Sequence, residues 1–214
     1  MSPLSRERVL RAAVAVADER GLNALTIRSL AQELGVKPMT VYHYVATKEE
    51  ILDGIVESVF GEIELPVPGR DWREELRKRA VSARAVFRRH PWALALLESR
   101  TQPGPASLRH HDATIGTLRL AGFSVVMTAH AYALLDSYVY GFALQEAALP
   151  FEGPDAAASV AEPIMETFPD DEYSHLAELA REHIMRPGYD FADEFEFGLD
   201  AVLDALARMR HGSP

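Results

Sequence analysis

The sequence predicts an all-α protein built from two helical parts, and three observations support this fold class. Apolar residues recur at helical spacing along most of the 214-residue chain. The alternation of apolar and polar residues that is typical of half-buried strands is absent. Breaks rich in proline and glycine, such as 103–105, separate the helical segments. We therefore expect an N-terminal domain at 1–48, a connector at 49–70 and a larger C-terminal domain at 71–214.

Two helices with clear start signals open the chain. The first begins after Ser5, whose hydroxyl can accept a free N–H of the first turn, and it ends at Gly21. The second is capped by Thr26 and covers 27–34. Its apolar residues recur at helical spacing and define one buried face: Ile27, Leu30, Ala31 and Leu34.

A tight turn and a third helix follow directly. Gly35 can adopt a left-handed backbone without a Cβ penalty, so it ends the second helix. Pro38 suits the first turn of another helix, at about 37–44, because the N–H that it lacks is not needed there. Helix, turn and helix at this spacing predict a helix-turn-helix whose second helix exposes Met39, Thr40 and His43.

The connector is also predicted to be helical. Thr47 and Glu50 have the spacing of a capping box, which starts a helix at about 48–63. Prolines and a glycine at 66–69 end this segment. The expected buried stripe of the connector consists of Ile51, Leu52, Ile55, Val56, Val59 and Phe60.

The C-terminal domain is predicted to contain six further helices. Asp71 can cap the first of them, and His90-Pro91 ends it, because the residue before a proline disfavours helical backbone. The proline-rich and acidic stretch 150–172 is expected to be a mobile loop with at most a short helical piece. The six expected helices cover about 71–89, 92–98, 106–121, 124–148, 173–184 and 191–209.

Composition and charge restrict the class of protein. The chain has no cysteine, so disulfides, thiol nucleophiles and thiolate metal sites are excluded. No apolar signal core and no run of about 18 apolar residues is present, so we expect a cytoplasmic protein that does not enter a membrane. The whole chain has a formal charge of −10, but seven basic and four acidic residues give 1–48 a charge of +3. A basic head on an acidic body favours local attraction to nucleic acid phosphates.

The N-terminal 60 residues resemble the TetR/AcrR family of bacterial transcriptional regulators. The residues that carry this resemblance are Thr26, Leu30-Ala31, Leu34-Gly35-Val36, Thr40-Val41-Tyr42, Tyr44 and Lys48-Glu49-Glu50-Ile51-Leu52. The resemblance implies a three-helix DNA-binding domain that contacts double-stranded operator DNA. We expect the contacts from Thr26, Arg28, Lys37, Pro38, Met39, Thr40, Tyr42, His43, Tyr44 and Lys48. The alternative for this segment is a helical hairpin that only packs well.

The rest of the chain resembles the tetracycline-repressor type of C-terminal domain within this family. The carriers are Asp71-Trp72-Arg73, Arg89-His90-Pro91-Trp92, Ala121-Gly122-Phe123, Tyr140-Gly141-Phe142-Ala143-Leu144 and Phe195-Glu196-Phe197-Gly198-Leu199. The resemblance implies a homodimer held by a four-helix bundle and a pocket for an unknown small-molecule effector. Apolar stripes on the long helix at 124–148 and on the last helix predict the interface residues Val139, Phe142, Phe195, Leu199, Val202, Leu203 and Leu206. Burial of these stripes within one chain is the alternative.

Aromatic and polar residues predict where the effector binds. Tyr132, Asp136 and Tyr140 are four residues apart and share one face of the long helix. A carboxylate in such surroundings requires a partner, because burying it unpaired is costly. That partner is a ligand or, as the alternative, Arg100 or another arginine. The full expected set is Phe87, Trp92, Arg100, Tyr132, Asp136, Ser137 and Tyr140.

Enzymatic classes find little support. The chain lacks a glycine-rich phosphate loop, a G-x-S-x-G elbow and an H-E-x-x-H pair. Glu172 and His175 form an isolated E-x-x-H motif, whereas a di-iron bundle needs two such motifs. Adjacent residues on a helix point about 100° apart, so we interpret His110, His111 and Asp112 as a solvated helix start rather than a metal site. We expect no catalytic residue, metal or cofactor.

These observations favour a homodimeric repressor that a small ligand releases from a palindromic operator. The alternative is a helical ligand-binding or scaffold protein whose N-terminal head does not read a specific site. A helical-bundle enzyme is the third and weakest interpretation.

Overall fold

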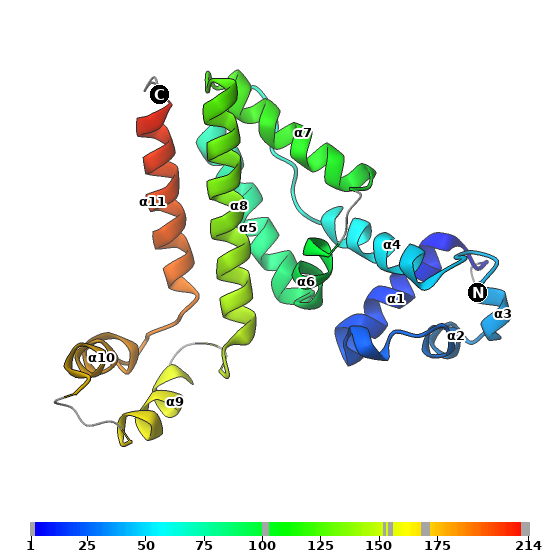
Figure 1. Cartoon of the computed structure of the whole chain (residues 1–214), viewed down its shortest axis with the longest axis horizontal. Helices are drawn as coiled ribbons and strands as arrows, with labels where there is room; N and C mark the ends of the chain where they lie inside the picture. The colour runs from blue at the N-terminus through cyan, green and yellow to red at the C-terminus, as the bar shows by residue number, and fades with distance from the viewer. Residues whose placement is uncertain (1–2, 100–102, 152, 154–155, 168–171, 211–214) are drawn as a thin grey trace.

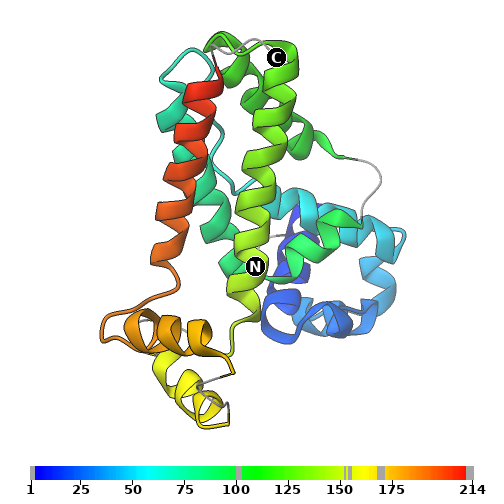
Figure 2. The same ribbon diagram turned by 60° about the vertical axis from the view of Figure 1, so that its left-hand side comes forward.

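Every regular element of the structure is a helix, which confirms the predicted fold class. The computed structural model describes residues 3–99, 103–151, 153, 156–167 and 172–210. Figures 1 and 2 show a small N-terminal head beside a body of longer helices. None of the described helices combines the length and apolar character needed to cross a bilayer. In chain order the helices are α1 (Arg6–Arg20), η1 (Leu22–Ala24), α2 (Ile27–Leu34), α3 (Pro38–Val41), α4 (Lys48–Phe60), α5 (Trp72–Arg89), α6 (Trp92–Glu98), α7 (Pro105–Leu120), α8 (Val125–Ala148), α9 (Ala156–Met165), α10 (Ser174–Leu179), η2 (Ala180–Ile184) and α11 (Asp193–Met209).

The caps predicted for the head are present. The hydroxyls of Ser5 and Thr26 accept hydrogen bonds from the backbone N–H groups of Arg8 and Ser29, at 3.2 and 3.0 Å. Gly35 adopts φ 66° and ends α2 in the left-handed region, where a side chain would be strained. α1 and α2 therefore start or stop where their local chemistry directs.

The second helix of the helix-turn-helix is shorter than expected. α3 ends at Val41, whereas the sequence predicted a helix to about Tyr44. The next residues form a tighter turn, in which the N–H of His43 bonds to the carbonyl of Thr40 at 3.3 Å. Thr47 then adopts extended backbone, with φ −136° and ψ 163°, and caps α4.

α4 belongs to both parts of the molecule. Its first turns complete the apolar core of the head, and Val59 and Phe60 join the core of the body. Thr47 caps α4 as predicted, by accepting the N–H of Glu50 at 3.1 Å. The carboxylate of Glu50 accepts from Ala46 at 2.8 Å, one residue earlier than a capping box requires. α4 thus links the position of the head to the body.

Three long helices, α5, α8 and α11, pack side by side in the body, and α7 lies across α5 and α8 (Figure 1). α11 comes very close to α8 at Gly198, where a Cβ atom would meet the hydroxyl of Tyr138. That hydroxyl donates to the carbonyl of Phe195 at 2.8 Å. The glycine is therefore required by helix packing rather than by a turn.

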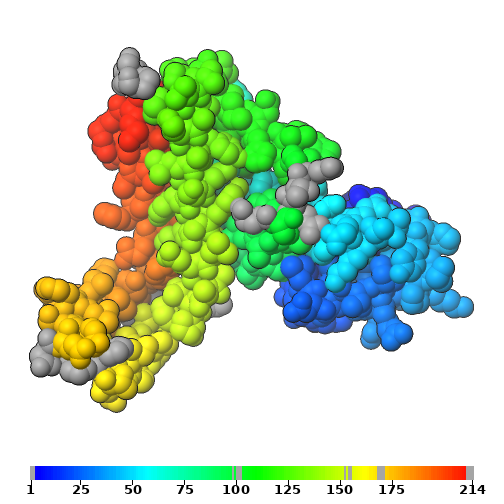
Figure 3. Space-filling model, viewed as in Figure 1, coloured from blue at the N-terminus to red at the C-terminus, as the bar shows by residue number. Residues whose placement is uncertain are grey.

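The stretch predicted as a loop contains a ten-residue helix, α9, which includes Pro163. The next predicted helix, 173–184, is present as α10 followed by a π-helical turn, η2. Part of the predicted loop, 168–171, lies outside the described residues. α9 and α10 project beyond the ends of α8 and α11 (Figures 1 and 3).

Candidate DNA-binding surface and effector site

One region of the head gathers all ten predicted DNA-binding residues. They lie at the start of α2, on α3, in the turn after it and at the first residue of α4. Eight of these side chains are exposed, while Thr40 and Tyr44 are half-buried. Met39 is 70% exposed on the short α3, which is unusual for a large apolar side chain. The arrangement leaves the second helix of the helix-turn-helix free to enter a DNA groove.

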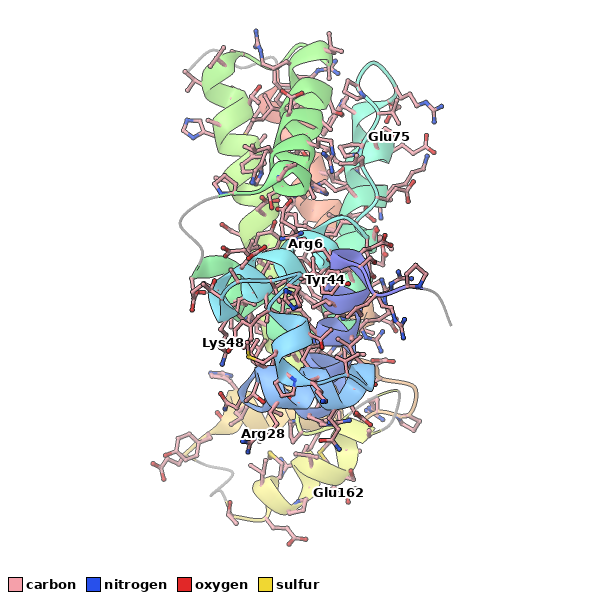
Figure 4. All side chains as sticks on the ribbon, turned by 90° about the vertical axis from the view of Figure 1, so that its right-hand side faces the viewer. Arg6, Arg28, Tyr44, Lys48, Glu75 and Glu162 are labelled. Atoms are coloured by element: carbon pink, nitrogen blue, oxygen red, sulfur yellow. The ribbon has the colours of Figure 1, made fainter. Side chains whose placement is uncertain are left out.

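Basic side chains on this surface are available to phosphates. Arg28, Lys37 and Lys48 form no ion pair with any residue that the structure describes, whereas Arg6 and Arg20 pair with glutamates at 3.3 and 3.2 Å. Figure 4 looks onto this side of the molecule, where Arg28 and Lys48 project from the head. Unpaired cations beside an exposed helix are the arrangement that backbone contacts to DNA require.

A charged cluster lies inside the body, between α5, α7 and α8. Arg79 is 1% exposed, and its Nη2 donates to Oδ1 of Asp136 at 2.6 Å. Its Nε donates to Nδ1 of His110 at a longer 3.4 Å. The carboxylate of Asp136 thus has an internal arginine partner, which was the alternative to direct ligand contact. Sequence reasoning did not identify Arg79 as that partner.

Two donors of this cluster stay unsatisfied. Among the described residues, neither Nη1 of Arg79 nor Nε2 of His110 has a hydrogen-bond partner, although both atoms are buried. Burial, together with the nearby Arg79 guanidinium, lowers the pKa of His110 to about 3, so the ring is neutral at pH 7. Because Nδ1 accepts from Arg79, the single ring proton lies on Nε2. The cluster therefore offers two N–H groups to a ligand that carries acceptor atoms.

Aromatic side chains surround this cluster. The rings of Phe87 and Tyr140 meet edge to face, with centroids 5.5 Å apart. The hydroxyl of Tyr132 bonds to Nδ1 of His111. Burial, and the adjacent carboxylate of Asp136, raise the pKa of the Tyr132 hydroxyl above its ordinary value. Four of the predicted effector residues are thus brought together, namely Phe87, Tyr132, Asp136 and Tyr140.

The other three predicted effector residues lie elsewhere. Trp92 faces the head, as described below. Ser137 is exposed on the outer face of α8, so it does not share the inward face of its neighbour Asp136. Arg100 lies outside the described residues.

The interpretation of His110 as part of a solvated helix start is wrong. This side chain is 1% exposed, because α7 turns the face that also carries Ser107, Thr114 and Thr117 into the body. His111 is half-buried and Asp112 is exposed. Within the described part of the chain, no group of three or more His, Cys, Asp or Glu residues could hold a metal ion.

A second polar junction joins the head to the body. Oδ1 of Asp18, on α1, accepts the indole N–H of Trp92 at 2.7 Å and lies 2.7 Å from Nδ1 of His90. The other ring nitrogen of His90 lies 3.4 Å from Glu62, which also accepts from Arg89 at 2.6 Å. These contacts hold α1 against the break between α5 and α6.

Six of the seven residues predicted for the dimer interface are buried within a single chain. Val139, Phe142, Phe195, Leu199, Leu203 and Leu206 are buried in the core of a single chain, and Val202 is half-buried. Their burial within one chain was the alternative. α8 and α11 carry apolar side chains on opposite faces, so a stripe does not reveal which face turns inward. The outward apolar side chains include Val126, Leu134, Leu144 and Phe197, and Phe197 is 75% exposed.

Known proteins share both halves of this architecture. Residues 9–55 match the family model of bacterial regulatory proteins of the tetR family. Residues 65–210 match the tetracyclin repressor-like C-terminal domain. The chain is 34% identical to the HTH-type transcriptional repressor DrrR1 of Streptomyces coeruleorubidus, over 95% of this chain and 77% of DrrR1. It is 29% identical to the class A tetracycline repressor from transposon 1721 of Escherichia coli, over 98% of this chain and 94% of that repressor.

Solved structures agree with the sequence relatives. Apo ActR from Streptomyces coelicolor superimposes with a TM-score of 0.79 at 26% identity, covering 98% of both chains. ActR in complex with actinorhodin superimposes with a TM-score of 0.78 at 27% identity, covering 99% of this chain and 100% of ActR. The helix-turn-helix, the second helical domain and these relatives together lead to one conclusion. The chain belongs to the TetR family of DNA-binding transcriptional regulators.

Proposed function

We propose that this chain is a homodimeric repressor that leaves a near-palindromic operator when a small molecule binds its C-terminal domain. Residues 1–48 contact DNA, 49–70 connect, and 71–214 dimerise and hold the effector. The observation that carries this proposal is the exposed face of the helix-turn-helix, with its basic side chains unpaired among the described residues. The relatives of the chain include repressors, which supports repression rather than activation.

On DNA, Lys37 and Lys48 contact phosphates, and α3 enters the major groove with Met39 and His43 toward base edges. Arg28 lies at the start of α2, where its guanidinium can reach a guanine with two hydrogen bonds. Such a contact discriminates between bases by roughly 1–3 kcal/mol.

The dimer forms through the outer faces of α8 and α11, because their inner faces fill the core of one chain. On α8, exposed side chains recur at helical spacing from Val126 through Leu134 to Leu144, and on α11 Phe197 stands out. Two copies of this helix pair make a four-helix bundle. The two-fold axis then places two heads on one side, which is why a near-palindromic operator is expected.

The effector binds at the buried cluster of Arg79, His110 and Asp136. Nη1 of Arg79 and Nε2 of His110 supply two donors without partners, and the surrounding aromatic rings suit an apolar, flat molecule. The effector therefore carries carbonyl, phenolic or carboxylate oxygens on an aromatic framework. The related ActR forms a complex with actinorhodin, which supports a small-molecule effector for this chain.

A direct contact between α4 and α7 can transmit the structural effect of effector binding to the head. The carboxylate of Glu57, on α4, accepts from the N–H of Ala106 at 2.6 Å and from the hydroxyl of Ser107 at 2.6 Å. Ser107 lies one turn before His110 on α7, so a ligand that displaces His110 also displaces the end of α7 that Glu57 holds. α4 then moves the head, and the spacing of the two heads no longer fits the operator.

The experiment that tests this function selects operator DNA from a random pool with the purified full-length protein. We expect enrichment of a sequence with two related half-sites in opposite orientation. Alanine variants of Lys37 and Lys48 should weaken its binding and reduce the dependence of binding on salt. A pool that shows no enriched sequence would support the scaffold alternative instead.

A further inference from the structure

A cavity of about 510 Å³ opens where the last turns of α5 and α8 meet the segment that leads into α11, at the lower end of α8 in Figure 1. None of the residues of the Arg79 cluster lines it. The volume falls within the range of small-molecule sites, which is roughly 300–1,000 Å³. The cavity is therefore large enough for a second ligand, separate from the effector cluster.

One wall of the cavity is apolar and carries small side chains. Ala85 of α5 and Ala143 and Ala147 of α8 contribute only methyl groups, so nothing obstructs a planar molecule that lies against them. Phe191 forms another wall, and its ring is held by stacking on Phe142, with centroids 4.9 Å apart and planes 19° apart. An aromatic framework fits between these surfaces.

Of the two arginines that line the cavity, Arg88 has the longer ion pair. Glu146 accepts from Nη2 and Nε of Arg84 at 2.6 and 2.9 Å, in a largely buried pair. Arg88 lies 3.8 Å from the same carboxylate, beyond hydrogen-bond distance, with its side chain 59% exposed. Arg89 is paired with a glutamate outside the cavity, and Asp190 accepts the N–H of Ala192 at 2.9 Å. Arg88 is thus the cation that can bind an anionic group on a ligand.

We propose that this cavity is a second ligand site, which takes a flat aromatic molecule carrying one carboxylate or sulfonate. The aromatic part lies between the alanine wall and Phe191, and the acidic group pairs with the guanidinium of Arg88. Arg89 and Pro91 also line the cavity, and the residue between them, His90, contacts Asp18 of α1. A ligand here therefore acts on the segment that holds the head, a consequence that rests on the proposed DNA-binding function.

Two fluorescent probes test the site on the full-length protein. The first, 8-anilinonaphthalene-1-sulfonate, is aromatic and anionic, and the second, N-phenyl-1-naphthylamine, has the same framework without the charge. We expect Arg88→Ala to weaken binding of the sulfonate about tenfold, the loss of one charge-assisted contact, and to leave the neutral probe within about twofold. Ala147→Phe fills the cavity and should weaken both probes.

Two controls separate this site from others. Arg109→Ala removes an exposed arginine of α7, outside the cavity, and should change neither probe. Arg79→Met alters the effector cluster, and unchanged probe binding in this variant separates the two sites. Melting curves that match the wild-type protein establish that the Arg88 and Ala147 variants are folded.

Each outcome decides a part of the proposal. If neither Arg88→Ala nor Ala147→Phe weakens either probe, the cavity is not a ligand site. If only Ala147→Phe has an effect, the cavity binds aromatic molecules but the assignment of an acidic ligand is wrong. Neither result bears on operator binding, so a failure here is distinct from a failure of the proposed function.

Discussion

Removing Asp136, the partner of Arg79, should destabilise the buried cluster strongly. In Asp136→Ala, Nη2 of Arg79 loses its 2.6 Å bond, while Nη1 has no partner among the described residues even in the wild-type protein. A guanidinium that is 1% exposed cannot recover those bonds from water. Breaking a buried ion pair in this way costs about 3–5 kcal/mol of unfolding free energy. In a chain of this size, the melting temperature should fall by roughly 6–20 °C.

Thermal and urea unfolding measure this loss, at one fixed protein concentration because the proposed dimerisation would shift the apparent stability. The double variant Arg79→Met, Asp136→Ala removes the charge together with its partner and should recover most of the loss. Asp112→Ala, at an exposed site on α7, should change stability by less than about 0.5 kcal/mol. A loss below about 1 kcal/mol in Asp136→Ala, or a double variant as unstable as the single one, would refute this reasoning.

Three further predictions concern DNA, the dimer and pH. Arg28→Ala should relax preference at one base pair per half-site, whereas Lys48→Ala should weaken all sequences about equally. Titrations against single-base operator variants distinguish the two, and an unchanged preference profile for Arg28→Ala excludes base contact. Phe197→Glu places a charge on the outer face of α11 and should yield monomers that do not bind operator; light scattering that still shows a dimer contradicts the assigned interface. The pKa of His110 falls from 6.5 to about 3 on folding, so the unfolded chain takes up this proton first and stability falls as pH drops from about 6.5 toward 3. His110→Gln should remove a slope of up to roughly 1.4 kcal/mol per pH unit in that range, and an unfolding free energy with the wild-type pH dependence would oppose this.

Local chemistry explains why the helices could be predicted. Ser5, Thr26 and Thr47 each accept an N–H of the turn that follows, and Gly35 takes the left-handed conformation that ends α2. These signals act within a few residues and therefore appear in the sequence itself. The early end of α3 was missed because residues 42–46 contain no glycine or proline that would signal it.

The faces of α8 and α11 could not be assigned in the same way. Both helices have apolar residues on more than one side, and only the packed structure distinguishes Leu199, which is buried, from Phe197, which is exposed. Which face of such a helix turns inward depends on the helices that pack against it, and these are far away in the sequence. Periodicity therefore identified apolar helices but could not distinguish the inward face of each helix from the outward one.

The buried cluster of Arg79, His110 and Asp136 was predicted in part. Helical spacing on α8 correctly placed Tyr132, Asp136 and Tyr140 on one face. Arg79 was missed because arginine is seldom buried, although it lies among Leu76, Ala80 and Ala83 in the apolar stripe of α5. A charged residue within such a stripe was the available signal, and its partner was the carboxylate within the apolar α8.

Effector binding at the Arg79 cluster and operator binding at the head are proposed to oppose each other. Calorimetry on the full-length protein measures this coupling, with a small molecule selected by thermal-shift screening that no longer binds the Arg79→Met variant. Thermodynamic linkage requires that the operator weakens binding of the ligand by the same factor by which the ligand weakens binding of the operator. Coupling of this kind is typically about 5–150-fold. We expect the affinity for the ligand to fall by such a factor when the operator is present. Equal ligand affinity with and without operator would contradict it.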